Sequence, residues 1–156
     1  MSESYIVIFL LAEEAYSIPV SCVQEIQGYH VIPPPRKIPD TPDHFEGLID
    51  LRGQVIPVLD LRRQLGLSAS VPSRKTCYII VDAHQEKVGL LVDAVVEVQR
   101  VQADAFQMPP ERMKAGVHRD YILGVGKLSP KNHDDDKKET SKRLVIQLNI
   151  ERLLDF

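Results

Sequence analysis

The 156-residue sequence contains no tryptophan, only two cysteines and no apolar run longer than Ile6–Ala12. A run of that length is far too short to cross a bilayer as a helix. The first residues, MSESYIV, lack the basic segment and the small-residue cleavage site of a signal peptide. Cys22 and Cys77 lie 55 positions apart in no C-x-x-C pattern, which indicates reduced, buried thiols. These absences predict a cytoplasmic protein without direct membrane contact.

The chain also lacks an excess of either charge. Its 19 Lys and Arg are interspersed with 22 Asp and Glu, and its aromatic residues are five Tyr and four Phe. Proteins that bind single-stranded nucleic acid combine a basic groove with aromatic stacking platforms. Neither feature is present, so we expect no nucleic-acid partner. A barrel-type nucleic-acid-binding module remains the alternative from a different functional class.

No motif of a known catalytic chemistry is present. The sequence has no G-x-S-x-G, no P-loop and no complete G-x-G-x-x-G, and its five histidines are scattered. Asp50, Asp60, Asp82 and Asp93 could supply paired carboxylates. Asp60, however, is better placed as a helix cap, and Asp82 and Asp93 lie at strand ends, where turn and capping roles are typical. A nucleophile, a base and oxyanion donors cannot be assembled from these residues. We therefore expect a protein that is not an enzyme, with no metal site and no cofactor.

What the sequence does contain is a succession of short segments rich in Val, Ile and Tyr. This pattern predicts strands at residues 5–11, 16–20, 48–51, 55–59, 77–82, 87–93, 95–101, 121–128 and 144–148. Segments 48–51 and 55–59 form a predicted hairpin, with Gly53 supplying a positive φ at its turn. Five prolines within residues 33–42 predict an extended surface connection. Residues 129–143 are expected to form a solvated, charged loop.

Three short helices are also predicted. The first spans SCVQEIQG, where Ser21 and Gln24 have the spacing of a capping box and Gly28 could end the helix. The second is LRRQL, capped by Asp60, and the third is IERLL, capped by Asn149. The chain is therefore expected to be all-β with a few short helices.

The chain also matches itself. Residues 16–26 align with 88–98, residues 46–51 with 123–128, and residues 56–65 with 145–154, in the same order. Each repeat has too few strands for a large sheet, and closing a small barrel removes exposed edges. We therefore predict one domain, 1–156, of two side-by-side five-stranded SH3-like β-barrels with a binding groove between them. The approximate halves are 1–70 and 71–156, and strands could be exchanged between them.

The charged Arg52 lies at the turn of the most hydrophobic hairpin. Taken alone, an arginine in a two-residue turn is most simply a solvated residue, and the same holds for Glu25. Arg52 could instead recognise a partner or fold back to order the turn and its neighbours. The sequence does not distinguish these alternatives.

At VQEI (23–26) and GLIDLRGQVIPVLDLR (47–62) the sequence resembles the CheW family of chemotaxis coupling proteins, and the match runs across nearly the whole chain. The resemblance implies a two-barrel fold and a non-catalytic adaptor. Such an adaptor couples the cytoplasmic tips of chemoreceptors to the regulatory domain of a CheA-type histidine kinase. It also implies a protein that is monomeric when free and is recruited to receptor arrays. The output could be motility, or pili in a chemotaxis-like pathway.

Carried over position by position, the resemblance implies that Val23, Glu25, Gly47, Arg52 and Val98 line or border the receptor-binding site. The kinase is expected to meet barrel surfaces end to end and to contact segment 104–112. The candidate kinase-binding residues in that segment are Phe106, Gln107 and Arg112.

Three features depart from the family pattern. Asp50 stands where family members usually carry Asn, and its carboxylate could pair with Arg52 and weaken the hold of Arg52 on a partner. The triple proline at 33–35 makes the connection longer than usual. The charged loop 129–143 resembles an insertion. These departures bear on the identity of the partner more than on the fold.

Overall fold

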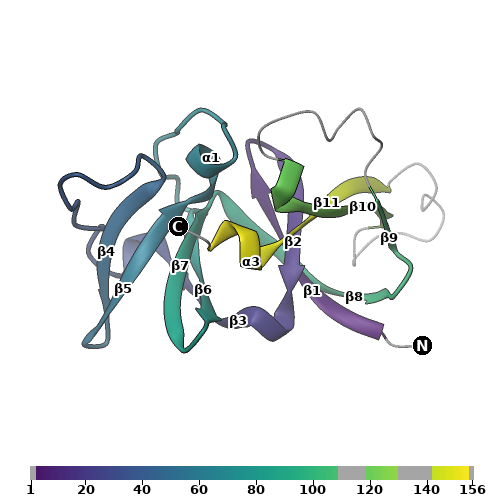
Figure 1. Ribbon diagram of the computed structural model, residues 1–156, viewed down its shortest axis with the longest axis horizontal. Helices are drawn as coiled ribbons and strands as arrows, with labels where there is room; N and C mark the ends of the chain where they lie inside the picture. The colour runs from purple at the N-terminus through teal and green to yellow at the C-terminus, as the bar shows by residue number, and fades with distance from the viewer. Residues whose placement is uncertain (1–2, 109–118, 130–141, 155–156) are drawn as a thin grey trace. The chain divides into compact units, whose positions relative to one another are not determined.

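The computed structural model describes residues 3–108, 119–129 and 142–154. Within these ranges most residues lie in strands, which form two sheets, and the α-helices are two single-turn segments. The chain divides into two compact units, one of residues 1–9, 13–21 and 96–156 and the other of residues 10–12 and 22–95. The predicted fold class, mainly β with a few short helices, is confirmed (Figure 1).

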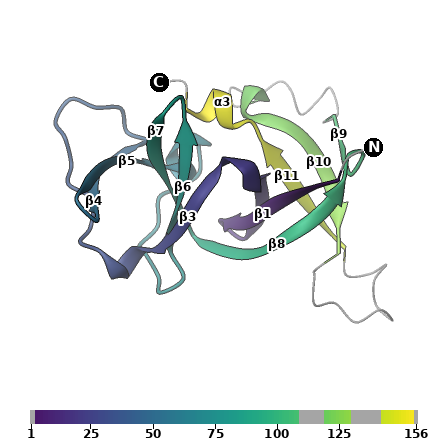
Figure 2. The ribbon, with the colours of Figure 1, turned by 90° about the horizontal axis from the view of Figure 1, so that it is seen from below.

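Unit 1 is built on a sheet with the strand order β8-β1-β2-β11-β10-β9. Strand β8 bends strongly along its length (Figure 2). Strands β2 and β11 run parallel, whereas β10 is antiparallel to both of its neighbours. The elements that form this unit are β1 (Glu3–Leu11), β2 (Glu14–Pro19), η1 (Val20–Cys22), β8 (Ala94–Gln102), β9 (Phe106–Gln107), η4 (Arg119–Tyr121), β10 (Ile122–Leu128), β11 (Arg143–Leu148) and α3 (Ile150–Leu153).

Unit 2 is built on a sheet with the strand order β3-β6-β7-β5-β4. Strands β5 and β7 run parallel, and the other neighbours are antiparallel. Its elements are β3 (Val23–Gly28), η2 (Tyr29–Val31), β4 (Phe45–Leu51), β5 (Gln54–Asp60), α1 (Leu61–Gln64), β6 (Cys77–Ala83) and β7 (Glu86–Val92).

The two sheets share one plan. Apart from β9, the order in unit 1 matches the order in unit 2 strand for strand, with the parallel pair β2–β11 corresponding to β7–β5. The hairpin turns agree as well: Ala12 and Glu13 have φ values of 51° and 70°, and His84 and Gln85 have 51° and 72°. These two turns are separated by the offset that aligns residues 16–26 with 88–98. The structure therefore supports the internal repeat.

The two units are not continuous in sequence. Strand β3 follows the β1–β2 hairpin along the chain but pairs within the sheet of unit 2, and β8 follows β6–β7 but pairs within the sheet of unit 1. Residues 1–70 and 71–156 thus each contribute strands to both compact units. The boundary differs from the approximate halves because strand pairing, rather than chain order, decides which segments pack together.

The predicted helix over SCVQEIQG is wrong. The structure has a 3₁₀ turn, η1, followed by strand β3, which pairs along its length with β6. The capping residues are local signals, and one short turn of helix is marginal by itself. Backbone hydrogen bonds between β3 and β6 outweigh this local helix preference, since they satisfy the N–H and C=O groups that a helix would have satisfied and also half-bury Val23.

The other two helix predictions are confirmed. The Asp60 carboxylate accepts a hydrogen bond from the Arg62 amide at 3.0 Å, at the start of α1. The Asn149 side chain accepts one from the Arg152 amide at 3.4 Å, at the start of α3. Burial raises the pKa of Asp60. The hydrogen bonds that its carboxylate accepts from the backbone of Arg62 and Arg63, and the charges of these two arginines, act in the opposite direction. Neither cysteine forms a disulfide; Cys77 is buried as expected, whereas Cys22 is only half-buried.

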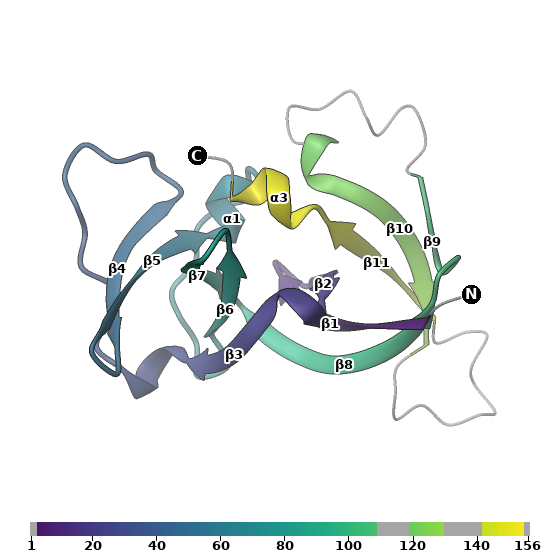
Figure 3. The same cartoon turned by 60° about the horizontal axis from the view of Figure 1, so that its bottom comes forward.

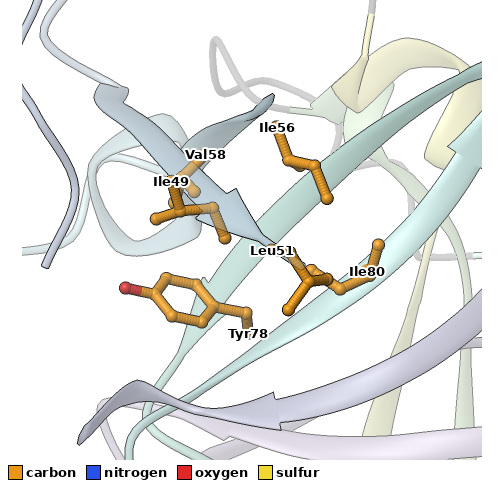
Figure 4. Packing of buried hydrophobic residues seen from close by; sticks show 6 residues of the cluster. All are labelled: Ile49, Leu51, Ile56, Val58, Tyr78 and Ile80. Atoms are coloured by element: carbon orange, nitrogen blue, oxygen red, sulfur yellow. The ribbon is translucent and has the colours of Figure 1, made fainter. Parts of the chain in front are cut away.

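Unit 2 has a well-defined apolar core in which Tyr78 supplies the largest side chain. Figure 4 shows the aromatic ring beside Ile49, with its hydroxyl at the end away from Leu51 and Ile80. The hydroxyl is buried and has no hydrogen-bond partner among the described residues. Burial, with Tyr29 and Glu46 nearby, raises the pKa of Tyr78 above its usual value. The members of this core are Ile49, Leu51, Ile56, Val58, Tyr78 and Ile80.

We expect Tyr78→Phe to increase the free energy of unfolding by about 1 kcal/mol, because it removes a buried hydroxyl that lacks a partner. Urea denaturation of both proteins measures the change. Tyr29→Phe, at a half-buried ring 5.6 Å from Tyr78, serves as the control and should have a smaller effect. A marked loss of stability in Tyr78→Phe would contradict this account of the hydroxyl.

Candidate functional site

Strands β4 and β5 form a hairpin (Figure 3). The predicted site residue Arg52 lies at its turn, between Leu51 and Gln54. Leu51 pairs with Gln54, so Arg52 and Gly53 form a two-residue turn with φ values of 52° and 86°. Two positive φ angles are the signature of a type I′ turn, which matches the twist of the flanking strands. The predicted turn, with Gly53 at positive φ, is confirmed.

Asp50 stabilises this turn. Its Oδ1 atom accepts a hydrogen bond from the Gly53 amide at 2.8 Å, as Asp and Asn side chains often do in turns. The Asp50 carboxylate thus binds the backbone of the turn, and the contact that Arg52 makes is with Glu25 and not with Asp50. Asparagine has an equivalent side-chain oxygen, so the Asp at position 50 preserves this local role.

Arg52 instead contacts Glu25. Its Nη2 lies 2.5 Å from Glu25 Oε1, and its Nη1 lies 3.1 Å from Oε2, which is a bidentate, charge-assisted pair. Glu25 is on β3, and β3 and β4 are the outermost strands in the sheet order of unit 2. The ion pair therefore links the two edges of that sheet.

The ion pair remains open to solvent. The Arg52 side chain is 64% exposed and that of Glu25 is 29% exposed. The hydrogen bond from Arg52 lowers the pKa of Glu25, and the same contact raises the pKa of Arg52. Both groups are therefore charged at neutral pH, and each keeps hydrogen-bonding capacity for a partner.

Val23 precedes Glu25 on the same strand, and a β-bulge separates them. Val23 pairs with Val81 and Glu25 pairs with Ile80, so β3 has one extra residue between the two pairs. The Gln24 side-chain amide donates to Asp82 Oδ2 at 3.1 Å. Bulges re-aim side chains at the edges of sheets. Val23 itself is half-buried.

Gly47 is buried and contributes through packing. Its φ is 140°, and a Cβ atom at this position would lie 2.4 Å from the Arg36 carbonyl oxygen. The Arg36 amide donates to Leu48 O at 2.8 Å, and the Leu48 amide donates to Arg36 O at 2.9 Å. Gly47 thus allows the proline-rich connection to lie against β4. This is a packing reason for glycine where the family resemblance implied a binding residue.

Val98 lies on β8 in unit 1 and is 39% exposed, with Val96 nearby at 41%. The sequence analysis places Val98 in one receptor site with residues of unit 2 and predicts a binding groove. Both statements stay predictions. Among the proposed kinase-binding residues, Phe106 is half-buried on β9 and Gln107 is exposed. Both pair with β10. Arg112 lies outside the described residues.

Sequence reasoning missed a cavity beside Gly47. The proline-rich connection and the β4–β5 hairpin line a pocket of about 580 Å³ that is open to solvent. Prolines and branched apolar side chains dominate its lining, which also includes Arg36, Lys37 and Asp50. The five prolines predicted an extended connection, but no local signal indicated that Arg36 would form a backbone bridge to Leu48.

The described part of the chain has neither a cluster of three metal-ligating side chains nor an apolar helix long enough to cross a membrane.

Comparison with known proteins gives consistent results. A family model described as a CheW-like domain matches residues 5–156. The chain is 31% identical over 147 residues to the chemotaxis protein CheW of Klebsiella aerogenes, covering 94% of this chain and 79% of that protein. It is 28% identical over 149 residues to the chemotaxis protein CheW of Helicobacter pylori, covering 94% and 78% respectively. The crystal structure of the scaffolding protein TtCheW from Thermoanaerobacter tengcongensis matches with a TM-score of 0.79 and 30% identity, over 99% of this chain and 94% of that one.

Proposed function

Because this chain belongs to the CheW-like family and is a chemotaxis coupling adaptor, we propose that it joins the cytoplasmic tips of chemoreceptors to the regulatory domain of a CheA-type histidine kinase. It does so without catalysis, in the cytoplasm, and it is recruited to receptor arrays by its partners. The match of the family model over residues 5–156 supports this assignment.

The receptor contacts Val23, Glu25, Arg52 and Val98, and Gly47 acts indirectly. The bidentate contact between Arg52 and Glu25 is the observation that carries this proposal. A helical receptor hairpin presents apolar side chains with polar groups beside them. Half-buried Val23 offers an apolar contact on the strand that carries Glu25, and the exposed guanidinium of Arg52 remains available for a charge-assisted hydrogen bond.

The kinase contacts the segment that contains Phe106, Gln107 and Arg112. Phe106 and Gln107 support this assignment because β9 is an outermost strand of its sheet, and outermost strands are accessible to partners. The two partners therefore use different strands of the adaptor, which allows both to bind at once.

Co-sedimentation tests the proposal. The purified protein is mixed with a receptor cytoplasmic fragment and a CheA-type kinase from the same cell, and the pellet is compared with mixtures that lack one component. A ternary assembly that requires this protein is the expected result. If it binds neither a receptor nor a kinase from that cell, the proposed function is wrong. Tight, salt-sensitive binding to an oligonucleotide would favour the nucleic-acid alternative.

We expect Glu25→Lys to weaken receptor binding about tenfold and to leave kinase binding unchanged. The lysine places an ammonium beside the Arg52 guanidinium, so the carboxylate offered to the receptor and its contact with Arg52 are both lost. Titration of labelled protein with each partner separately measures both affinities. Asp43→Lys makes the same charge change at an exposed loop residue of unit 2 and should bind normally. Equal losses for both partners would indicate a general folding defect instead.

A further inference from the structure

A second ion pair in unit 2 joins Arg62, the last residue of the motif at 47–62, to Asp93. Arg62, on α1, donates from Nε to Asp93 Oδ1 at 2.8 Å and from Nη2 to Asp93 Oδ2 at 2.6 Å. The remaining terminal nitrogen of Arg62 donates to the Ser68 carbonyl at 2.8 Å. The two residues are 31 positions apart, so no local pattern predicts their contact. The guanidinium thus holds the carboxylate and the loop that follows α1 at the same time.

Asp93 connects this pair to the β1–β2 turn. Its Oδ2 accepts a hydrogen bond from the Ala12 amide at 2.8 Å, and its own amide donates to the Leu10 carbonyl at 3.1 Å. The chain passes from unit 2 to unit 1 directly after Ala12 and again after Val95. One carboxylate therefore anchors, within unit 2, the ends of two segments that continue into unit 1.

The internal repeat shows that the same strand order can form without this pair. The alignment of 16–26 with 88–98 places Ser21 at the position of Asp93. The alignment of 56–65 with 145–154 places Glu151 at the position of Arg62. A serine and a glutamate cannot form an arginine–carboxylate pair, yet the two sheets have the same strand order. The pair is therefore present in only one of the two repeats.

The surroundings of the pair favour a stable geometry. The Arg62 and Asp93 side chains are 18% and 27% exposed, against 64% for Arg52. Burial raises the pKa of Asp93, but the hydrogen bonds from Arg62 and Ala12 together lower it below the usual value. The carboxylate is therefore ionised at neutral pH. Partly buried pairs are screened by salt much less than exposed ones.

We propose that Arg62 and Asp93 are a positioning pair that fixes the path of the chain from β7 into β8 and thereby sets the strength of receptor binding through Val98. This inference rests on the proposed receptor site. Neither residue contacts the receptor; the pair holds the start of the strand that carries Val98. Because the carboxylate also binds the Ala12 amide, loss of the pair loosens the β1–β2 turn in the same step.

The test compares Arg62→Gln, Asp93→Asn and the double variant with the parent protein. Each single variant should weaken binding of a receptor fragment about tenfold, and the double variant should be no weaker than the weaker single one, because the residues act as a unit. Hydrogen exchange should become faster at Ala12 and at residues 94–98, while the amides of β6 and β7 keep their rates. Arg63→Gln changes the same charge on the same helix and should leave binding and exchange unchanged.

The outcomes separate this inference from the proposed function. If the parent protein binds the receptor and both single variants bind equally well, the positioning role is wrong and the receptor site stands. If exchange becomes faster throughout β6 and β7, the pair is only a stability element and the positioning role is again wrong. If the parent protein does not bind any receptor fragment, the proposed receptor site is wrong. Independently of receptor binding, unchanged hydrogen exchange at Ala12 and at residues 94–98 in the variants would overturn the positioning role.

Discussion

Arg52→Glu is expected to weaken receptor binding roughly 30-fold, because a charge that meets the partner is reversed. The substitution also brings two carboxylates together where the bidentate contact with Glu25 lies. The fold should survive, since Arg52 is 64% exposed and is already accommodated at positive φ. We therefore expect the melting temperature to change by less than about 3 °C.

Receptor titration together with circular dichroism measures both effects. Arg74→Glu, at an exposed loop position of the same unit, makes the same charge change and should bind normally. The double variant Arg52→Glu, Glu25→Arg restores the opposite charges with exchanged positions. Partial recovery of binding in that variant would support a role for the pair as such. If Arg52→Glu unfolds, Arg52 is structural and its assignment to the receptor site is wrong.

Gly47→Ala should be strongly destabilising, with a loss of about 2–4 kcal/mol in the free energy of unfolding. Alanine is strained at a φ of 140°, and its Cβ would lie 2.4 Å from the Arg36 carbonyl oxygen. Backbone at that distance cannot stay in place, so the bridge between Arg36 and Leu48 must break. Receptor binding should then fall as a consequence of the displaced connection.

Gly53→Ala is the matched control, since it lies in the same hairpin at a φ of 86° and its added Cβ would meet no atom within 4 Å. It should lose only about 1 kcal/mol, from backbone strain alone. Urea denaturation compares the two variants. Equal stability of Gly47→Ala and the parent protein, combined with lost receptor binding, would instead make Gly47 a direct contact and overturn the packing explanation.

The β4–β5 hairpin could be predicted from sequence because its determinants are local. Alternating apolar residues, a glycine in the second turn position and a capping Asp60 each act within a few residues. The same reasoning failed over 21–28, where Ser21 and Gln24 gave a local helix signal. Pairing of β3 with β6, whose residues lie 49 to 58 positions further along the chain, outweighed it. Local rules do not contain information about such distant partners.

The candidate site was predicted only in part for the same reason. The resemblance at VQEI and LRG singled out Glu25 and Arg52, but it did not show that their side chains bind each other. The closeness of Asp50 and Arg52 in sequence left a pairing between them open. In the structure the Asp50 carboxylate binds the Gly53 amide. A short side chain lies close to the backbone of its own turn, whereas the long side chain of Arg52 extends away from it.

Local residue patterns were enough to predict the mainly β composition, the hairpin turn and the two helix caps, because each depends on residues near one another in the chain, and comparison of the chain with itself was enough to predict the repeat. The pairing of β3 and β8 could be read from the tertiary structure alone: each strand pairs in the other unit from the hairpin that precedes it in the chain. The tertiary structure also decided that Arg52 meets Glu25, that Arg62 meets Asp93 and that the backbone at Arg36 covers Gly47. These contacts join segments that strand pairing brings together, and the free energy of that pairing depends on the whole sheet.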